Sequence, residues 1–142
     1  ASLLTWPFAR QWLPLIVGDS RNSEPRNMLH ARYWTTTYPT TALLPMAALV
    51  KAVMGEDFSG VSVPALFYYS MDDLVVDPAE TAAFADQWGG AVTFVHPQLG
   101  TGDDEYAHVI AGDIVSPQQT GSAVQEMLRW LSAQPGWPVS GR

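Results

Sequence analysis

The chain is 142 residues long, the usual size of one domain, and 47% of its residues are hydrophobic, which excludes an intrinsically disordered chain. The net charge of −7 argues against a nucleic-acid partner, because proteins that bind phosphate backbones gather Lys and Arg on one surface. There is no cysteine, so disulfides and thiol chemistry are excluded.

The charge is divided unevenly along the chain. Residues 1–55 hold five basic and two acidic groups, a net +3, whereas residues 56–142 hold two basic and twelve acidic groups, a net −10. This change predicts a domain boundary near residue 55. The apolar stretch 3–17 has no basic segment before it and is interrupted by Pro7, Arg10 and Pro14. We therefore expect neither a signal peptide nor a membrane span, and we expect a cytoplasmic location.

Residues 1–55 are predicted to be helical. Apolar residues recur at roughly helical spacing over residues 3–16, before Gly18. After a polar turn at residues 18–24, Pro25 suits the first turn of a second helix that runs to about Tyr38. A third helix is predicted over residues 41–54, ending at Gly55.

Residues 56–142 show a different pattern. Residues 64–70 form a short apolar run, which is typical of a strand buried on both faces. Asp77, Pro78 and Glu80 then form a helix start signal, and this helix is expected to continue through Trp88 to the glycines at 89–90. Residues 91–95 are the next predicted strand. Strand, helix and strand in about thirty residues indicate a βαβ unit with parallel strands.

A long polar loop from Pro97 to about Val115 precedes the last predicted helix. Ser116 and Pro117 repeat the start signal, with Ser116 expected to cap the helix. The apolar residues of this helix fall on one face, which is expected to pack in the core: Val124, Met127, Leu128 and Leu131.

A carboxylate and an imidazole follow the two predicted strands. Asp72 and Asp73 come after the first strand, and His108 lies in the loop after the second. Functional groups in open α/β sheets lie beyond the carboxyl ends of the strands, so these side chains are expected to meet at one edge. A carboxylate that accepts the Nδ1 proton of histidine leaves Nε2 free to act as a general base.

Two segments resemble a known family. Ser70-Met-Asp-Asp73-Leu-Val-Val76-Asp-Pro resembles the acid turn of the α/β-hydrolases, and residues 107–117 resemble their histidine loop and the start of their last helix. The monoglyceride-lipase and serine-aminopeptidase-like group is the most similar, over residues 61–131. The resemblance implies that Asp73 is the acid and His108 the base of a Ser-Asp-His triad. Asp72 competes for the acid role, and the spacing from Ser70 favours Asp73.

The same resemblance implies the fold: a C-terminal fragment of an α/β-hydrolase. Residues 1–55 would be a helical cap, and residues 56–142 the C-terminal part of the core, a βαβα unit with a short parallel sheet. The implied activity is that of a serine hydrolase of carboxylic esters, as a lipase, esterase or peptidase. It would need no metal and no cofactor, and its substrate would be a small hydrophobic ester or acyl compound.

The family's nucleophile motif, G-x-S-x-G on a strand-to-helix turn, is absent from the sequence. The nearest segment, Gly60-Val-Ser62-Val-Pro64, ends in proline and precedes a strand. We therefore expect the serine on a missing N-terminal half of the same protein, and this chain alone to be inactive. The alternative is a fragment without activity of its own that forms a homodimer through its exposed sheet edge.

Other polar and aromatic residues are interpreted as structural. His30 is expected to be a helix-surface or core histidine. His96, directly after the second strand, is expected to hydrogen-bond a backbone group near the site. Residues 103–105, Asp-Asp-Glu, are predicted to form a solvated loop tip rather than a metal site. Trp6 and Trp12 are expected to pack within the cap.

Overall fold

The computed structural model describes residues 2–136 and combines helices with two short sheets. The chain divides into two compact units, Ala1–Glu56 and Asp57–Arg142. The division falls next to the position where the charge changes sign.

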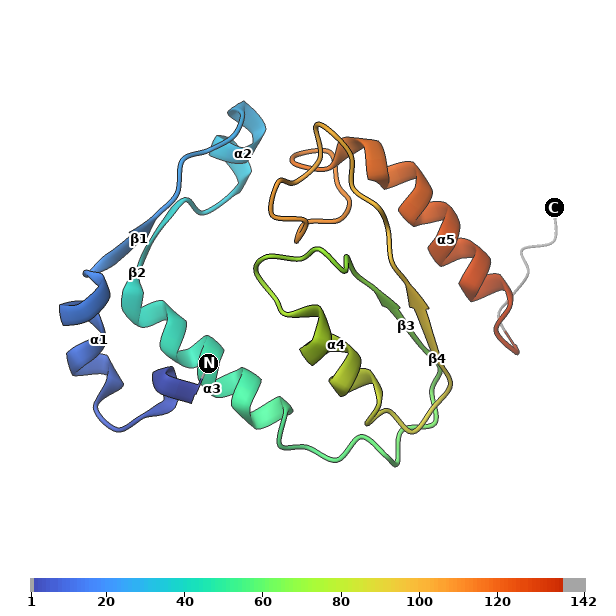
Figure 1. Ribbon diagram of the computed structural model, residues 1–142, viewed down its shortest axis with the longest axis horizontal. Helices are drawn as coiled ribbons and strands as arrows, with labels where there is room; N and C mark the ends of the chain where they lie inside the picture. Colours follow the sequence, from blue (N-terminus) through green and yellow to red (C-terminus); the bar gives the residue numbers. More distant parts are fainter. Residues whose placement is uncertain (1, 137–142) are drawn as a thin grey trace. The chain divides into compact units, whose positions relative to one another are not determined.

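The first unit holds a small antiparallel ladder as well as helices (Figure 1). Strand β1 pairs with β2, Arg21 opposite Tyr38. The elements of this unit are the 3-10 helix η1 (Ser2–Thr5), α1 (Ala9–Val17), β1 (Ser20–Asn22), α2 (Met28–Tyr33), β2 (Thr37–Pro39), η2 (Thr40–Ala42) and α3 (Leu43–Val53).

The second predicted helix is wrong over most of its length. Its helical part is only Met28–Tyr33, and Thr37–Pro39 form strand β2 instead. The helix begins at Met28 rather than near Pro25, because the side chain of the N-cap Asn27 accepts a hydrogen bond from the main-chain N–H of His30 at 2.8 Å. The third helix follows the prediction closely, since α3 covers Leu43–Val53.

The first unit buries few side chains. Ala9, Leu13 and Ala47 are buried, as is Thr40, whose hydroxyl donates to the carbonyl of Gly18 at 2.6 Å. Several large apolar side chains of α1 and its surroundings are exposed, among them Trp6, Phe8, Leu15 and Ile16.

The second unit contains the predicted βαβ arrangement. Strand β3 (Ala65–Tyr68) and strand β4 (Val92–Val95) are parallel neighbours, with Ala65 opposite Val92, and α4 (Pro78–Ala85) connects them. The prediction of adjacent, parallel strands is confirmed. A 3-10 turn, η3 (Pro117–Gln119), and helix α5 (Thr120–Ser132) complete the unit.

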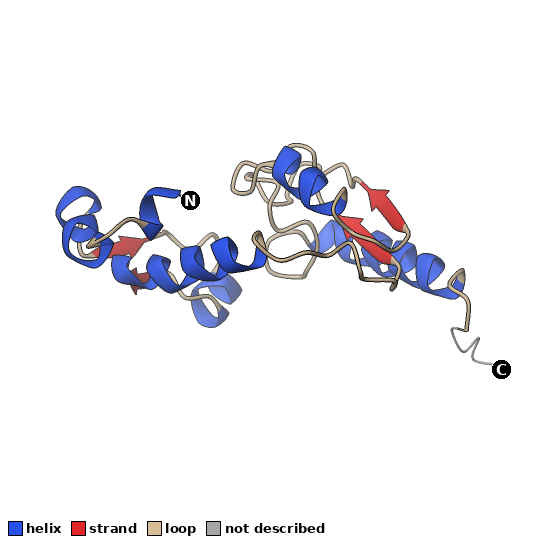
Figure 2. Ribbon diagram, turned by 90° about the horizontal axis from the view of Figure 1, so that it is seen from below, coloured by secondary structure: helices blue, strands red, loops and turns tan. Residues whose placement is uncertain are grey.

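The two longer helices of this unit lie on opposite faces of the β3–β4 sheet (Figure 2). Phe84 of α4 meets the ring of Phe67 edge-on, with ring centres 6.2 Å apart. Trp130 of α5 donates its indole N–H to the hydroxyl of Thr93 at 3.1 Å. In the ladder Phe67 lies opposite Phe94, and Thr93 lies opposite Leu66. The two contacts therefore come from adjacent pairs, whose side chains point to opposite faces of the sheet.

The helix between the strands begins as predicted but ends earlier. The Asp77 side chain accepts from the N–H of Ala79 at 2.9 Å, with Pro78 in the first turn. The helix ends at Ala85, before Trp88. Beyond the end of the helix, the indole N–H of Trp88 donates to the carbonyl of Val63 at 2.8 Å, next to β3. At Gly89 a Cβ atom would lie 1.9 Å from the carbonyl oxygen of Ser59, so only glycine fits.

The last helix differs from its prediction at both its start and its packing. Ser116 makes no side-chain cap, and α5 begins at Thr120 after a 3-10 turn. Val124, Met127 and Leu128, predicted to face the core, are exposed in the structure. Within residues 2–136 no helix is long and apolar enough to cross a membrane.

Candidate active site

Residues 70–76, the acid turn, follow the carboxyl end of β3 and hold Asp73 in a fixed orientation. Oδ1 of Asp73 accepts hydrogen bonds from the main-chain N–H groups of Val75 at 2.8 Å and Val76 at 2.9 Å. Ser70, at the start of the turn, is buried, and its hydroxyl oxygen accepts from the N–H of Asp72 at 3.1 Å. Because one carboxylate oxygen is held by the main chain, the other is directed outward from the turn.

The structure brings Asp73 and His108 together. Oδ2 of Asp73 lies 2.9 Å from Nδ1 of His108. A main-chain hydrogen bond beside this pair, from Leu74 N–H to the Tyr106 carbonyl at 2.9 Å, ties the two loops to each other. In Figure 1 the chain leaving β3 and the orange loop before α5 lie beyond the same ends of the two strands. This is the edge where the sequence predicted the meeting.

The environment of the pair keeps Asp73 ionised. Burial raises the pKa of Asp73, but hydrogen bonds from His108, Val76 and Val75 and the charge of a protonated His108 outweigh it, so the pKa is lower than the ordinary 3.8. An ionised carboxylate can only accept at this position, so Nδ1 carries the proton.

The outer nitrogen of the imidazole is accessible. The His108 side chain is 42% exposed, whereas that of Asp73 is only 9% exposed. Among residues 2–136, no group forms a hydrogen bond with Nε2 of His108. The pair therefore has the geometry of an oriented general base: a carboxylate fixes one ring nitrogen, and the other can exchange a proton with a bound molecule.

Residues 104–116, the histidine loop, are organised around a buried carboxylate. Asp104 is 6% exposed, so the predicted solvated loop tip is wrong at this residue. Oδ1 accepts from the N–H of Tyr106 at 3.2 Å, and Oδ2 from the N–H groups of His108 at 3.1 Å and Val109 at 2.8 Å. The buried carboxylate is satisfied by these main-chain donors of a tight loop.

Ser116, at the C-terminal end of the same loop, also stabilises it through hydrogen bonds. Its hydroxyl is fully buried, accepts from the N–H of Asp104 at 3.0 Å and donates to the carbonyl of Val109. Its predicted role as a helix cap is therefore replaced by a role inside the loop. Between these bonds Ala107 has a φ of 50°, in the left-handed region that disfavours residues other than glycine.

The other candidates for the acid and the nucleophile are placed elsewhere. The structure pairs His108 with Asp73, while Asp72 is exposed beside it. Ser62 is exposed in the loop before β3, at the opposite end of that strand from Asp73. Ser70 is buried with its hydroxyl oxygen engaged by Asp72, and no serine within residues 2–136 forms a hydrogen bond with the His108 ring.

The remaining histidines make structural contacts. His30 accepts the N–H of Arg26 on Nδ1 at 3.1 Å and meets Trp34 edge-on. His96 lies with Nδ1 3.3 Å from the carbonyl of Tyr69 and packs edge-on against the Tyr69 ring. Neither ring contacts a carboxylate in the described part of the chain.

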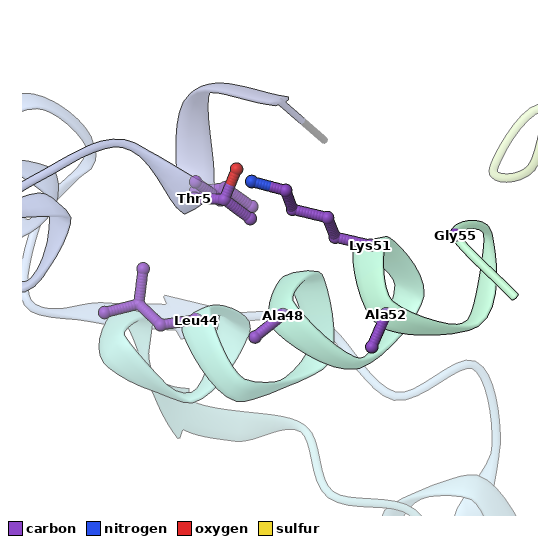
Figure 3. A pocket seen from close by; sticks show the side chains of 7 residues that line it. Thr5, Leu44, Ala48, Lys51, Ala52 and Gly55 are labelled. Carbon is purple, nitrogen blue, oxygen red and sulfur yellow. The ribbon is translucent and has the colours of Figure 1, made fainter.

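Within residues 2–136, neither the metal-ligating residue types nor the cavity of the first unit provides a second catalytic pair. Across residues 2–136, no three His, Asp or Glu side chains are grouped so that they could hold a metal ion. A cavity of about 530 Å³ in the first unit lies between η1 and α3 (Figure 3). Its walls are mostly apolar, and Lys51 is the charged residue among those lining it: Leu4, Thr5, Leu44, Ala48, Lys51, Ala52 and Gly55.

Comparison with protein-family models, with curated proteins and with solved structures finds no match to this chain. The motifs of the sequence and the geometry of Asp73 and His108 are therefore the basis for inferring a function.

Proposed function

We propose that Asp73 and His108 are the acid and the base of a Ser-Asp-His triad in a serine hydrolase of carboxylic esters. The observation that carries the proposal is the 2.9 Å contact between Asp73 Oδ2 and His108 Nδ1, with Oδ1 held by Val75 and Val76. On this proposal residues 56–142 are the C-terminal part of an α/β-hydrolase core and residues 1–55 its helical cap.

The proposed reaction needs a serine from a segment outside these 142 residues. Its hydroxyl oxygen attacks the acyl carbon of the ester while Nε2 of His108 takes the hydroxyl proton. The carbon–oxygen ester bond then breaks, and the alcohol leaves with that proton. A water molecule attacks the acyl-enzyme in the same way, which releases the acid and restores the serine. Asp73 stays ionised throughout and stabilises the imidazolium.

The proposed substrate is a small hydrophobic ester or acyl compound. Large apolar and aromatic side chains are exposed in the first unit, including Trp6, Phe8 and Ile16, and such residues suit contact with an acyl chain. No metal or cofactor enters the proposed chemistry.

The test is labelling with a fluorophosphonate probe, which reacts with activated serines, followed by intact-mass measurement. We expect no mass shift on the 142-residue chain. We expect a shift on a longer protein that carries upstream sequence with a G-x-S-x-G motif, and its loss in the His108→Ala variant. His30→Ala is the matched control and should leave labelling unchanged. A shift on the 142-residue chain, mapped to Ser62 or Ser70, would contradict the proposal that the nucleophile lies outside it.

A second candidate function is self-association without activity. Each strand of the β3–β4 sheet has one neighbour within the described residues, which leaves an unpaired edge on each side. Val124, Met127 and Leu128 form an exposed apolar surface on α5. On this proposal two copies associate and cover the sheet edge and this surface.

Sedimentation equilibrium tests the second candidate. A homodimer is expected for the wild-type chain, and a monomer for Leu128→Glu. Gln125→Glu, which adds the same charge at another exposed position of α5, is the control and should remain dimeric. A wild-type chain that stays monomeric at all concentrations would rule self-association out.

A further inference from the structure

The buried carboxylate of Asp104 has no part in the proton transfer described above, yet it contacts the main chain of the proposed base. Oδ2 of Asp104 accepts from the N–H of His108 itself and from that of Val109. Oδ1 accepts from Tyr106. One side chain therefore holds three main-chain N–H groups within a segment of four residues, with His108 among them.

This arrangement determines where the imidazole lies. The Tyr106 carbonyl accepts a hydrogen bond from the N–H of Leu74, so the segment that Asp104 holds by hydrogen bonds is also bonded to the acid turn. Ala107, directly before His108, has a φ of 50°, which costs free energy for a residue with a Cβ atom. The hydrogen bonds of Asp104 on both sides of Ala107 compensate this cost and keep the His108 side chain directed at Asp73.

Ser116, twelve residues after Asp104 in the sequence, forms hydrogen bonds with the same loop. Its hydroxyl accepts from the N–H of Asp104 and donates to the carbonyl of Val109, so Asp104 and the residue after His108 share one buried partner. The hydroxyl thereby joins the loop to the segment that leads into α5.

We infer that Asp104 is the positioning residue of this site: it holds the main chain around His108 so that Nδ1 meets Asp73 and Nε2 remains free. The inference deepens the proposed function and rests on it for its catalytic meaning. In an active parent enzyme, a displacement of the base by about 1 Å would lower turnover by roughly 100-fold.

The experiment measures the orientation of His108 directly, without substrate or nucleophile. The 142-residue chain is labelled with ¹⁵N in its histidines, and NMR reports which ring nitrogen carries the proton. In the wild type we expect the Nδ1–H form of His108 and a low-field proton resonance from the bond to Asp73. His30 and His96 are internal references, because their contacts do not involve Asp104.

The variants remove the Asp104 contacts in steps. Asp104→Asn keeps one acceptor oxygen, but whichever way its amide turns, an NH₂ group faces at least one main-chain N–H. We expect a weaker low-field resonance in Asp104→Asn and its loss in Asp104→Ala, with His108 shifting toward the Nε2–H form. Asp103→Asn is the matched control, since the carboxylate of Asp103 accepts from Gly100 and Gln119 and not from residues 106–109.

The inference is overturned if both Asp104 variants keep the wild-type His108 signals, or if Asp103→Asn changes them equally. If Asp104→Ala does not fold, as judged by its main-chain amide spectrum, Asp104→Asn decides. Failure of this test differs from failure of the proposed function. A chain in which Asp104 orients His108 but whose longer form never reacts with a fluorophosphonate would keep the positioning role and lose the hydrolase.

Discussion

The acid turn and the histidine loop each present one polar side chain beyond the carboxyl end of a strand of the same two-stranded sheet. In the acid turn, the bonds that orient Asp73 come from Val75 and Val76, two and three residues away. In the histidine loop, His108 depends on Asp104, four residues earlier, and Asp104 depends on Ser116, twelve residues later. A short-range turn and a buried polar network thus position the two halves of one hydrogen bond.

The largest effect is expected from the acid itself. Asp73→Asn keeps the shape of the side chain but can present an N–H₂ group to Nδ1, so His108 is left in the wrong tautomer. If the parent protein is a serine hydrolase, we expect its turnover to fall about 10⁴-fold. The measurement is steady-state hydrolysis of a short-chain ester by the longer, active protein.

Asp72→Asn is the control for that prediction and decides between the two candidate acids. Because Asp72 is exposed and does not contact His108, its variant should retain turnover close to that of the wild type. A large loss in Asp72→Asn with little loss in Asp73→Asn would transfer the acid role to Asp72.

The next largest effect concerns the β3–β4 sheet, because the acid turn and the histidine loop both follow its strands. A Cβ atom at Gly89 would lie 1.9 Å from the carbonyl oxygen of Ser59, so Gly89→Ala forces the main chain before β3 and β4 apart. We expect the free energy of unfolding of the second unit to fall by about 3 kcal/mol. Hydrogen exchange of the amides of β3 and β4 measures this value locally.

Gly60→Ala is the matched control in the same segment, because nothing lies within 4 Å of a Cβ atom built there. Its free energy of unfolding should stay within about 0.5 kcal/mol of the wild type. Equal effects of the two substitutions would show that the close approach at Gly89 does not hold the sheet together.

Each of the two loops contains one buried serine, Ser70 in the acid turn and Ser116 in the histidine loop. Ser116→Ala removes two hydrogen bonds and leaves buried groups of Asp104 and Val109 without this partner, so we expect a loss of about 2 kcal/mol. Ser70→Ala removes one bond, from the N–H of Asp72, and should cost about 1 kcal/mol. The free energies of unfolding come from hydrogen exchange. A larger cost for Ser70→Ala would mean that the acid turn, too, depends on buried contacts.

The features readable from the sequence are those whose causes lie close together in the chain. The cap at Asp77, the apolar run of β3 and the meeting of Asp73 with His108 follow from local patterns and from the rule that parallel strands end at one edge. The catalytic roles of Asp73 and His108 stay predictions.

The features that the sequence did not predict depend on distant partners or on very short elements. Asp104 stands between two other acidic residues, which is typical of a solvated loop. Its burial follows from main-chain donors that converge only in the folded loop and from Ser116. Asn and Asp side chains often bond main-chain N–H groups a few residues on, and that tendency is the one local signal that could have indicated Asp104. The β1–β2 ladder spans three residues in each strand, too few for an alternating pattern.

The smallest effect is the pH response of the Asp73–His108 hydrogen bond. Burial raises the pKa of Asp73, but the hydrogen bonds from His108, Val76 and Val75 together have the larger effect, so the pKa lies below 3.8. A carboxyl whose pKa is depressed in the folded state contributes stability that is present above the unfolded value and lost as the pH falls through the folded value. We therefore expect the Asp73 carboxylate to remain ionised between pH 7 and about 4 and to take up its proton only below that range. The ¹³C chemical shift of the Asp73 carboxyl carbon follows this titration.

In His108→Ala the midpoint should move up, because the imidazole no longer donates to Oδ2, but Val75 and Val76 still donate to Oδ1 and keep part of the depression. A wild-type midpoint at or above 3.8, unchanged in His108→Ala, would mean that the two side chains do not form this bond in solution, and the acid turn would then lose its partner in the histidine loop.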